Sequence, residues 1–318
     1  MADATPIKID ALLAKVETTY GTDPTPATSA NEIRVNDRIW TNLTIAHQFE
    51  NLRDDAATGT LSPPATGAKR GRIGTLTIPV ELTGSRSGNA YSASNLPPLS
   101  PLIKSCGMSQ AIVTTSMSET VTYSEANSSL SSCTIWAYSG NKLIKMTGCR
   151  GNIRWPILAG QLGTVMFEMT GMVSGITESS VASASYTSSV PPAAVGMSLT
   201  VGSWSPDVME AEFDLGNSVV VVPSGNGSDG IAQVQISRRT PTWTLRAKAP
   251  AISTYDPWTI ARTPTTGAIA LTVGSTQYNR ADLAVTASYL NDPEMEDQDG
   301  LAGLRLVYRC VTPTIVFD

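Results

Sequence analysis

Apolar and polar residues alternate along most of this chain. The stretch RIGTLTIPVEL, residues 72–82, has an apolar side chain at nearly every second position from Ile73 to Leu82. A strand with one buried face requires this period of two. The same pattern predicts further strands at residues 132–138, 143–146, 163–172, 209–215, 218–222, 231–236, 242–247, 269–273, 283–290 and 304–308.

Helical patterns are few and short. Only residues 9–16, 99–106 and 257–262 are predicted to be helical, and each spans about two turns at most. Many short strands separated by Gly and Asn turns favour sandwiches or barrels over a parallel sheet. We therefore expect an all-β protein with a few short helices, built as β-barrel or β-sandwich domains.

One segment stands out as a connector between two packed units. Residues 176–196 are rich in Ser, contain Pro191-Pro192 and have little to bury. A chain of this length has room for two ordinary cores. The expected organisation is an N-terminal arm at 1–30, a first β domain at 31–176, a linker at 177–196 and a second β domain at 197–318.

The two sides of this connector follow the same order of predicted elements, which is the signal of an internal repeat. Each side has a strand, then a short helix, then a hairpin, then a final strand. A duplicated domain has a geometric consequence, because a ring of three chains then presents six similar units. The matching stretches are 71–84, 97–107, 139–142 and 163–173 on the first side, and 236–250, 253–263, 267–290 and 301–311 on the second.

Composition and charge argue against two functional classes, namely nucleic-acid binding and membrane insertion. The 318 residues carry a formal net charge of −5, with 22 Lys and Arg against 27 Asp and Glu. Nucleic-acid binders neutralise phosphates with clustered basic residues, so we expect any contact with DNA to be repulsive or neutral. No apolar run approaches the roughly 20 residues that cross a bilayer, so we expect no membrane insertion. The N-terminus lacks the pattern of a secretory signal, and we expect cytosolic synthesis.

Cysteine and histidine offer little for metal chemistry. The chain has four cysteines without CxxC spacing and one histidine, His47, so we expect no metal site and no cofactor. Cys133 and Cys149 flank a predicted hairpin that turns at Gly140-Asn141. Such a two-residue turn pairs position 133 with 148 and places the two sulfurs on opposite faces, so we expect buried free thiols.

Two local motifs invite a ligand interpretation. Residues 225–230 spell GxGxxG after an apolar run, but a dinucleotide site needs a helix to begin there, and the following IAQVQISRR alternates like a strand. We expect a hairpin loop. The acidic cluster at 292–299 lacks the spacing of a calcium loop and is interrupted by Pro293, so we expect a solvated turn that marks a charged rim or lining.

Two short basic patches, 69–72 and 238–239, occupy equivalent places in the two repeats, just ahead of a strand. They are interpreted either as solvated strand ends or as partner contacts. Catalysis has no local signal, because His47 has no nucleophile elbow nearby. A hydrolase that uses paired carboxylates is supported only by the number of Asp and Glu residues, since no local motif indicates it.

A carbohydrate-binding β-sandwich is a further alternative. In that interpretation some of the six tryptophans serve as stacking platforms, although large aromatic side chains usually pack in a core. The six are Trp40, Trp136, Trp155, Trp204, Trp243 and Trp258.

The stretch VETTYGTDP, residues 16–24, follows the first predicted helix. That helix is too short to be stable alone, so the segment has to dock on something to be ordered. Together with the duplicated β domains, this stretch resembles the major tail tube proteins of siphophages, bacteriophages with non-contractile tails, that carry two tube domains per chain. Other stretches that carry the resemblance are 15–26 with Asn31, 78–82, 101–108, 121–123, 142–153, 159–172, 213–219 and 237–244.

The resemblance implies a virion structural protein with no catalytic, cofactor or metal residues. Such proteins, assembled in the host cytoplasm, form homotrimeric rings that stack into a tube through which viral DNA passes without specific binding. Expected partners are other copies of the chain and the tape measure, tail terminator and distal tail proteins. The segment that would then fasten neighbouring subunits comprises Glu17, Thr18, Thr19, Tyr20, Gly21, Thr22, Asp23 and Pro24.

Overall fold

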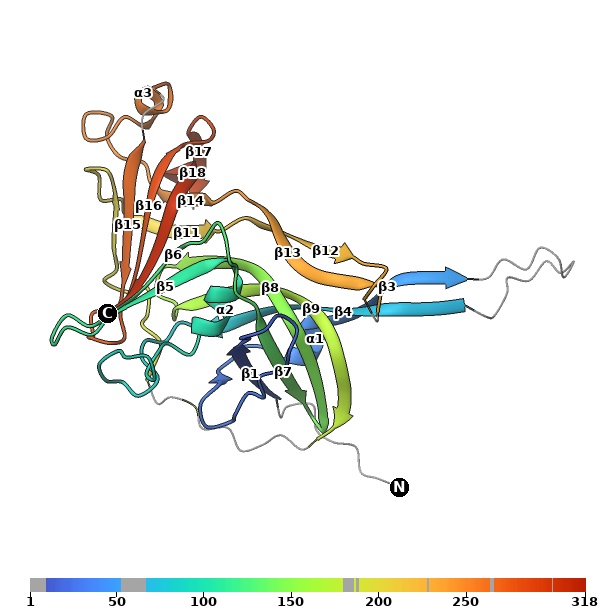
Figure 1. Ribbon diagram of the computed structural model, residues 1–318. Helices are drawn as coiled ribbons and strands as arrows, with labels where there is room; N and C mark the ends of the chain where they lie inside the picture. Colours follow the sequence, from blue (N-terminus) through green and yellow to red (C-terminus); the bar gives the residue numbers. More distant parts are fainter. Residues whose placement is uncertain are drawn as a thin grey trace, which may run out of the picture.

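The computed structural model describes residues 10–52, 67–179, 186, 189–227, 229–263, 266–298 and 300–318. Strands dominate these ranges, and the three helices within them are short (Figure 1). The first half contains β1 (Asp10–Val16), β2 (Glu32–Ile33), α1 (Ile39–Asn42), β3 (Leu43–Leu52), β4 (Gly67–Glu81), α2 (Ser100–Ser105), β5 (Met108–Val113), β6 (Thr120–Glu125), β7 (Cys133–Ser139), β8 (Lys142–Leu158) and β9 (Thr164–Glu178).

The second half contains β10 (Ser198–Val201), β11 (Val208–Asp214), β12 (Asn217–Pro223), β13 (Ile231–Arg239), β14 (Thr242–Lys248), α3 (Pro257–Ala261), β15 (Gly267–Val273), β16 (Ala281–Tyr289), β17 (Glu294–Gln298) and β18 (Leu301–Phe317). The expected all-β class with a few short helices is confirmed. The helices predicted at 99–106 and 257–262 are α2 and α3.

One large sheet runs through both halves of the chain. Its main path is β10-β15-β16-β18-β14-β11-β8-β7-β1-β2, so the strands of the second half meet those of the first half where β11 pairs with β8. The register at this seam aligns Phe213 with Trp155. Both side chains are almost fully buried, so the seam is part of the core.

The pairing pattern of the first half recurs in the second. In the first half β4 pairs with β9, β9 with β8, β8 with β7 and β7 with β1. In the second half β14 pairs with β18, β18 with β16, β16 with β15 and β15 with β10. The helices α2 and α3 follow corresponding strands, β4 and β14. The order of elements that the sequence shows twice is therefore accompanied by the same order of strand pairing.

Each half also has a long hairpin. β3 and β4 pair from Leu43 to Leu52. β12 and β13 form a separate two-stranded sheet that continues from β11 and β14. Gly216 marks the bend between β11 and β12, where φ is +64° and a Cβ atom would lie 2.1 Å from the carbonyl oxygen of Thr240. In Figure 1 both hairpins extend to the same side of the molecule.

The helix predicted at residues 9–16 is wrong, because residues 10–16 form β1. This strand pairs with β7 on one side and β2 on the other. Leu12 packs in the main core and Leu13 in a second, smaller cluster, so both faces of the strand are buried. A strand buried on both faces is apolar without alternation, which makes it hard to distinguish from a buried helix by pattern.

The expected placement of the two cysteine sulfurs is also wrong. The hairpin turns at Gly140-Asn141 as predicted, but a register shift in β8 pairs Cys133 with Cys149 rather than with residue 148. Gly148 supplies the positive φ of this bulge, +63°. The bulge also explains why the predicted strand at 143–146 is only the start of the 17-residue β8. The four cysteines are free and buried, as expected.

Candidate functional site

One face of the large sheet carries an ion-pair ladder. On β11, Glu210, Glu212 and Asp214 alternate with the buried Ala211 and Phe213, so these carboxylates lie on the face opposite the core. Arginines on β8, β14 and β18 lie on the same face, since each is flanked along its strand by buried residues. We call this surface the open face.

Arg154 is the centre of the first group on the open face. Its guanidinium lies 2.7 Å from Glu212 and 3.7 Å from both Glu168 and Asp214. The hydrogen bond to Glu212 and the nearby carboxylates raise the pKa of Arg154. This one cation therefore joins β9, β8 and β11.

Arg246 and Arg305 continue the ladder toward the far edge of the sheet. Arg246 lies 2.9 Å from Glu210 and 3.3 Å from Glu296. Arg305 lies 2.9 Å from Glu294 and 3.9 Å from Glu296. With the first group, these ion pairs join six carboxylates to three arginines. The cations Lys248 and Arg309 lie on the same face of β14 and β18, so a small excess of negative charge remains. A surface of this sign repels the phosphates of nucleic acid.

The acidic cluster predicted as a turn supplies part of this ladder. Residues 294–298 form β17, which pairs with β18, and are not the solvated turn that the sequence suggested. Arg246 and Arg305 neutralise part of the local repulsion, which lets the carboxylates lie along a strand. Asp299 lies outside the described residues.

The segment at residues 17–24 is anchored on its own chain by Glu17. This buried carboxylate accepts hydrogen bonds from Ser132 Oγ at 2.6 Å, Thr134 Oγ1 at 2.7 Å and the backbone N–H of Gly148 at 2.7 Å. The N–H of Gly21 adds a fourth at 2.8 Å. A buried carboxylate with four donors fixes the segment to the bulge in β8.

Tyr20 extends this anchorage to the β12–β13 hairpin. Its hydroxyl donates to the carbonyl of Gly148 at 3.2 Å and accepts from the N–H of Val234 at 2.5 Å. Arg150 lies 5.1 Å from the ring centroid and donates to the carbonyl of Val234. Burial raises the pKa of Tyr20, so its hydroxyl stays neutral and able to donate.

The remaining residues of the segment divide between inward and outward positions. Asp23 accepts a hydrogen bond from Trp136 at 3.1 Å and lies 3.5 Å from Lys145. Gly21 has a φ of +74°, and the carbonyl of Pro24 accepts from Lys15. The side chains that remain exposed are those of Thr18, Thr19 and Thr22.

The other motifs singled out in the sequence do not form ligand sites in the structure. The described residues of the GxGxxG stretch, 225–227 and 229–230, lie between β12 and β13, and Ser228 lies outside the described residues. The strand that follows excludes a dinucleotide fingerprint, which needs a helix there. Trp155, Trp204 and Trp243 are buried in the core and so cannot act as stacking platforms for sugars. His47 lies exposed on β3, opposite Arg72.

The two basic patches lie within strands rather than ahead of them, in β4 and β13. Arg239 pairs with Glu125 at 3.6 Å. Among the described residues, no group of three or more His, Cys, Asp or Glu side chains is placed to hold a metal ion. No helix in the described part of the chain is long and apolar enough to span a membrane.

The strand-rich fold and the repeated pairing pattern define an all-β protein. Comparison with protein families identifies it further, because the family described as phage tail tube protein matches residues 10–302. The chain belongs to this family. It is a non-enzymatic structural component of a virion tail. A search of curated proteins finds no match.

Proposed function

We propose that this chain is the major tail tube protein of a siphophage and forms trimeric rings that stack into a tube. The family match over residues 10–302 carries the general function. The repeated strand pairing supports the finer proposal, since two similar β units in one chain, one before and one after residues 177–196, would produce such a repeat. Three such chains supply six units to a ring.

The acidic open face suits the lining of the channel. It carries more carboxylates than arginines and is opposite the core. A lining that held phosphates tightly would stop DNA in transit, because each phosphate contact adds affinity. DNA therefore passes without specific binding on its way into the host cell.

The segment at 17–24 contributes to contacts between subunits in this proposal. Glu17 and Tyr20 are occupied within the chain, so the contact would use the exposed Thr18, Thr19 and Thr22. The tape measure, tail terminator and distal tail proteins are the further partners that we expect for the assembled tube.

Cryo-electron microscopy of the purified chain tests this proposal. We expect hollow tubes whose rings have three copies and a pseudo-sixfold cross-section, with the open face toward the channel. Rings of six copies would overturn the tandem-domain proposal. A chain that remains monomeric at all concentrations would overturn the tube itself.

A further inference from the structure

The two halves differ at one equivalent place. In the first half α2 packs against β1, β7 and β8 and buries Leu102 and Ile103. The helix at the same position in the second half is α3, of which only Pro257 is buried. The strands that correspond to β1, β7 and β8 by pairing are β10, β15 and β16. The second half therefore lacks the helix packing that fills this place in the first.

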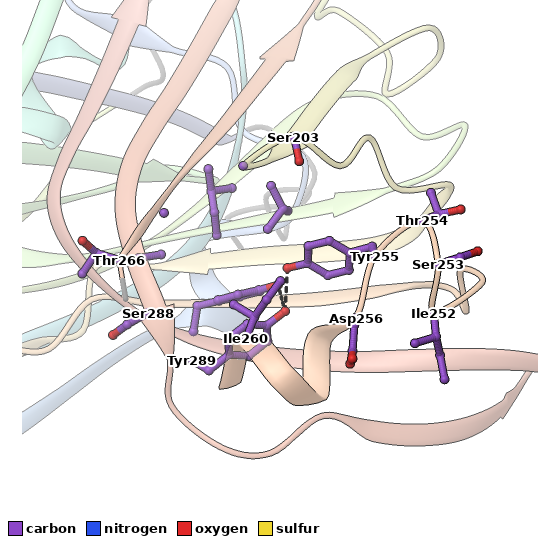
Figure 2. Close-up of a pocket in the computed structure, with 16 residues that line it drawn as sticks. Ser203, Ile252, Ser253, Thr254, Tyr255, Asp256, Ile260, Thr266, Ser288 and Tyr289 are labelled. Carbon is purple, nitrogen blue, oxygen red and sulfur yellow. Dashed lines mark hydrogen bonds between the residues drawn. The ribbon is translucent and has the colours of Figure 1, made fainter. Parts of the chain in front are cut away.

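A cavity of about 390 Å³ occupies the region between α3 and these strands. Figure 2 shows its lining, with Tyr255 and Asp256 from the chain that leads into α3 and Ser288 and Tyr289 from the end of β16. Val201 of β10 and Ile269 of β15 complete the floor. Its volume is in the range of ordinary ligand pockets.

Three tyrosine hydroxyls meet at this cavity. Those of Tyr255 and Tyr289 are 2.6 Å apart, and Tyr308 donates to Tyr289 at 3.2 Å. Burial raises the pKa of Tyr289 and Tyr308, so both are neutral. The three hydroxyls contact one another, so their polar groups are paired and the tyrosine rings provide the apolar part of the lining.

The charges around the cavity limit what can enter. Among the described residues that line it there is no Lys or Arg, and Asp256 is the one charged side chain. The Asp256 carboxylate is already hydrogen-bonded to the N–H and hydroxyl of Thr259. An anion is disfavoured, whereas an uncharged apolar group suits the tyrosine rings.

Met117 presents such a group at the opposite end of the same sheet. It lies in the turn between β5 and β6, has a φ of +65° and is 85% exposed. β6 pairs with the C-terminal end of β18, where Val121 aligns with Phe317. The cavity lies nearer the other end of these strands, at Tyr289 and Tyr308.

We infer that Met117 of one copy inserts into the tyrosine-lined cavity of a second copy in the next ring. This inference rests on the proposed function. A contact between opposite ends of one molecule is heterologous and propagates into an open stack. Thioether sulfur packs favourably against aromatic rings and is a weak hydrogen-bond acceptor. The turn already holds Met117 outside, so the side chain needs no rearrangement to dock.

Met117→Asp tests the contact by placing a charge in the cavity. We expect at least a tenfold rise in the protein concentration at which tubes appear, measured by sedimentation and negative-stain microscopy. Met209→Asp is the matched control, since Met209 is also exposed but lies on β11, outside both the β5–β6 turn and the cavity lining. Its tubes should form at the wild-type concentration, and circular dichroism should show both variants folded.

Cysteine cross-linking tests proximity directly. We expect a disulfide-linked dimer when Met117→Cys chains are mixed with Ser253→Cys chains, since Ser253 lines the cavity and is exposed. Met209→Cys mixed with Ser253→Cys is the control and should not cross-link. Wild-type tubes together with normal Met117→Asp tubes and no cross-link would overturn the cavity contact and leave the tube standing. A wild-type chain that never polymerises would overturn both.

Discussion

Glu17 is the residue on which the local order of the N-terminal segment depends. It brings four donors from three parts of the chain onto one buried carboxylate. Replacing Glu17 by Gln keeps the size of the side chain but places an NH₂ group opposite hydrogen-bond donors that the carboxylate had accepted from. We therefore expect the free energy of unfolding to fall by about 3 kcal/mol. Urea denaturation measures this loss. Glu178→Gln is the control, because its pair with Lys142 is exposed and screened by water, so this variant should unfold at the wild-type urea concentration.

The four cysteines allow a second prediction at the residue scale. Burial raises the pKa of Cys106, Cys149 and Cys310, the last to about 12. Thiol reagents attack the thiolate, and a raised pKa keeps these groups protonated up to high pH. We expect no labelling of the native protein at pH 8 and labelling of all four thiols in denaturant. Fast labelling of the native chain would show that the core opens readily.

Several residue-scale features follow from the sequence and others do not. The buried free thiols and the hairpin loop at 225–230 were predictable from spacing and alternation. The four donors of Glu17 were not, because they come from positions more than a hundred residues apart as well as from the next turn.

At the scale of elements, the bend at Gly216 sets the direction in which the β12–β13 hairpin leaves the main sheet. Gly216 has a φ of +64°, and a Cβ atom there would lie 2.1 Å from the carbonyl oxygen of Thr240, so any other residue at this position would be strained. We expect Gly216→Ala to cost about 1–3 kcal/mol and to raise hydrogen exchange in the hairpin. Gly225→Ala is the matched control, since a Cβ there meets nothing within 4 Å. Equal effects at both sites would contradict this role of the bend.

Element prediction worked best where one face of a strand is exposed. Residues 72–82 and 163–172 alternate, and both are strands. It failed for β1, which is buried on both faces, and for most of β8, where the bulge interrupts the pattern. It also missed β3, β5, β6 and β10. Deleting residues 1–30 would also remove β1 from the core, so such a deletion cannot isolate the role of residues 17–24 in subunit contacts. Charge substitutions at Thr18, Thr19 and Thr22 test the same contact and leave β1 in place.

For the whole molecule, the sign of charge on the open face has a measurable consequence. If this face lines the channel, Glu294→Lys with Glu296→Lys should slow the release of DNA from virions, because phosphates would meet new cations. Ejection triggered in vitro and followed with a DNA-binding dye measures the rate. Glu178→Lys, outside the ladder, should leave the rate unchanged. Unaltered release from the double variant would place β17 away from the channel.

The sequence by itself determined the β class, the repeated order of elements and the acidic balance, because alternation, turn residues and charge are local properties of the chain. Only the tertiary structure decided that β8 and β11 join the two halves in one sheet and that six carboxylates and three arginines share one face. It also decided that a cavity lies beside α3, whereas α2 packs against the strands at the equivalent place in the first half. These features depend on register and on pairing between distant strands. A change of one residue in register exchanges the two faces of a strand, and no local pattern specifies the partner.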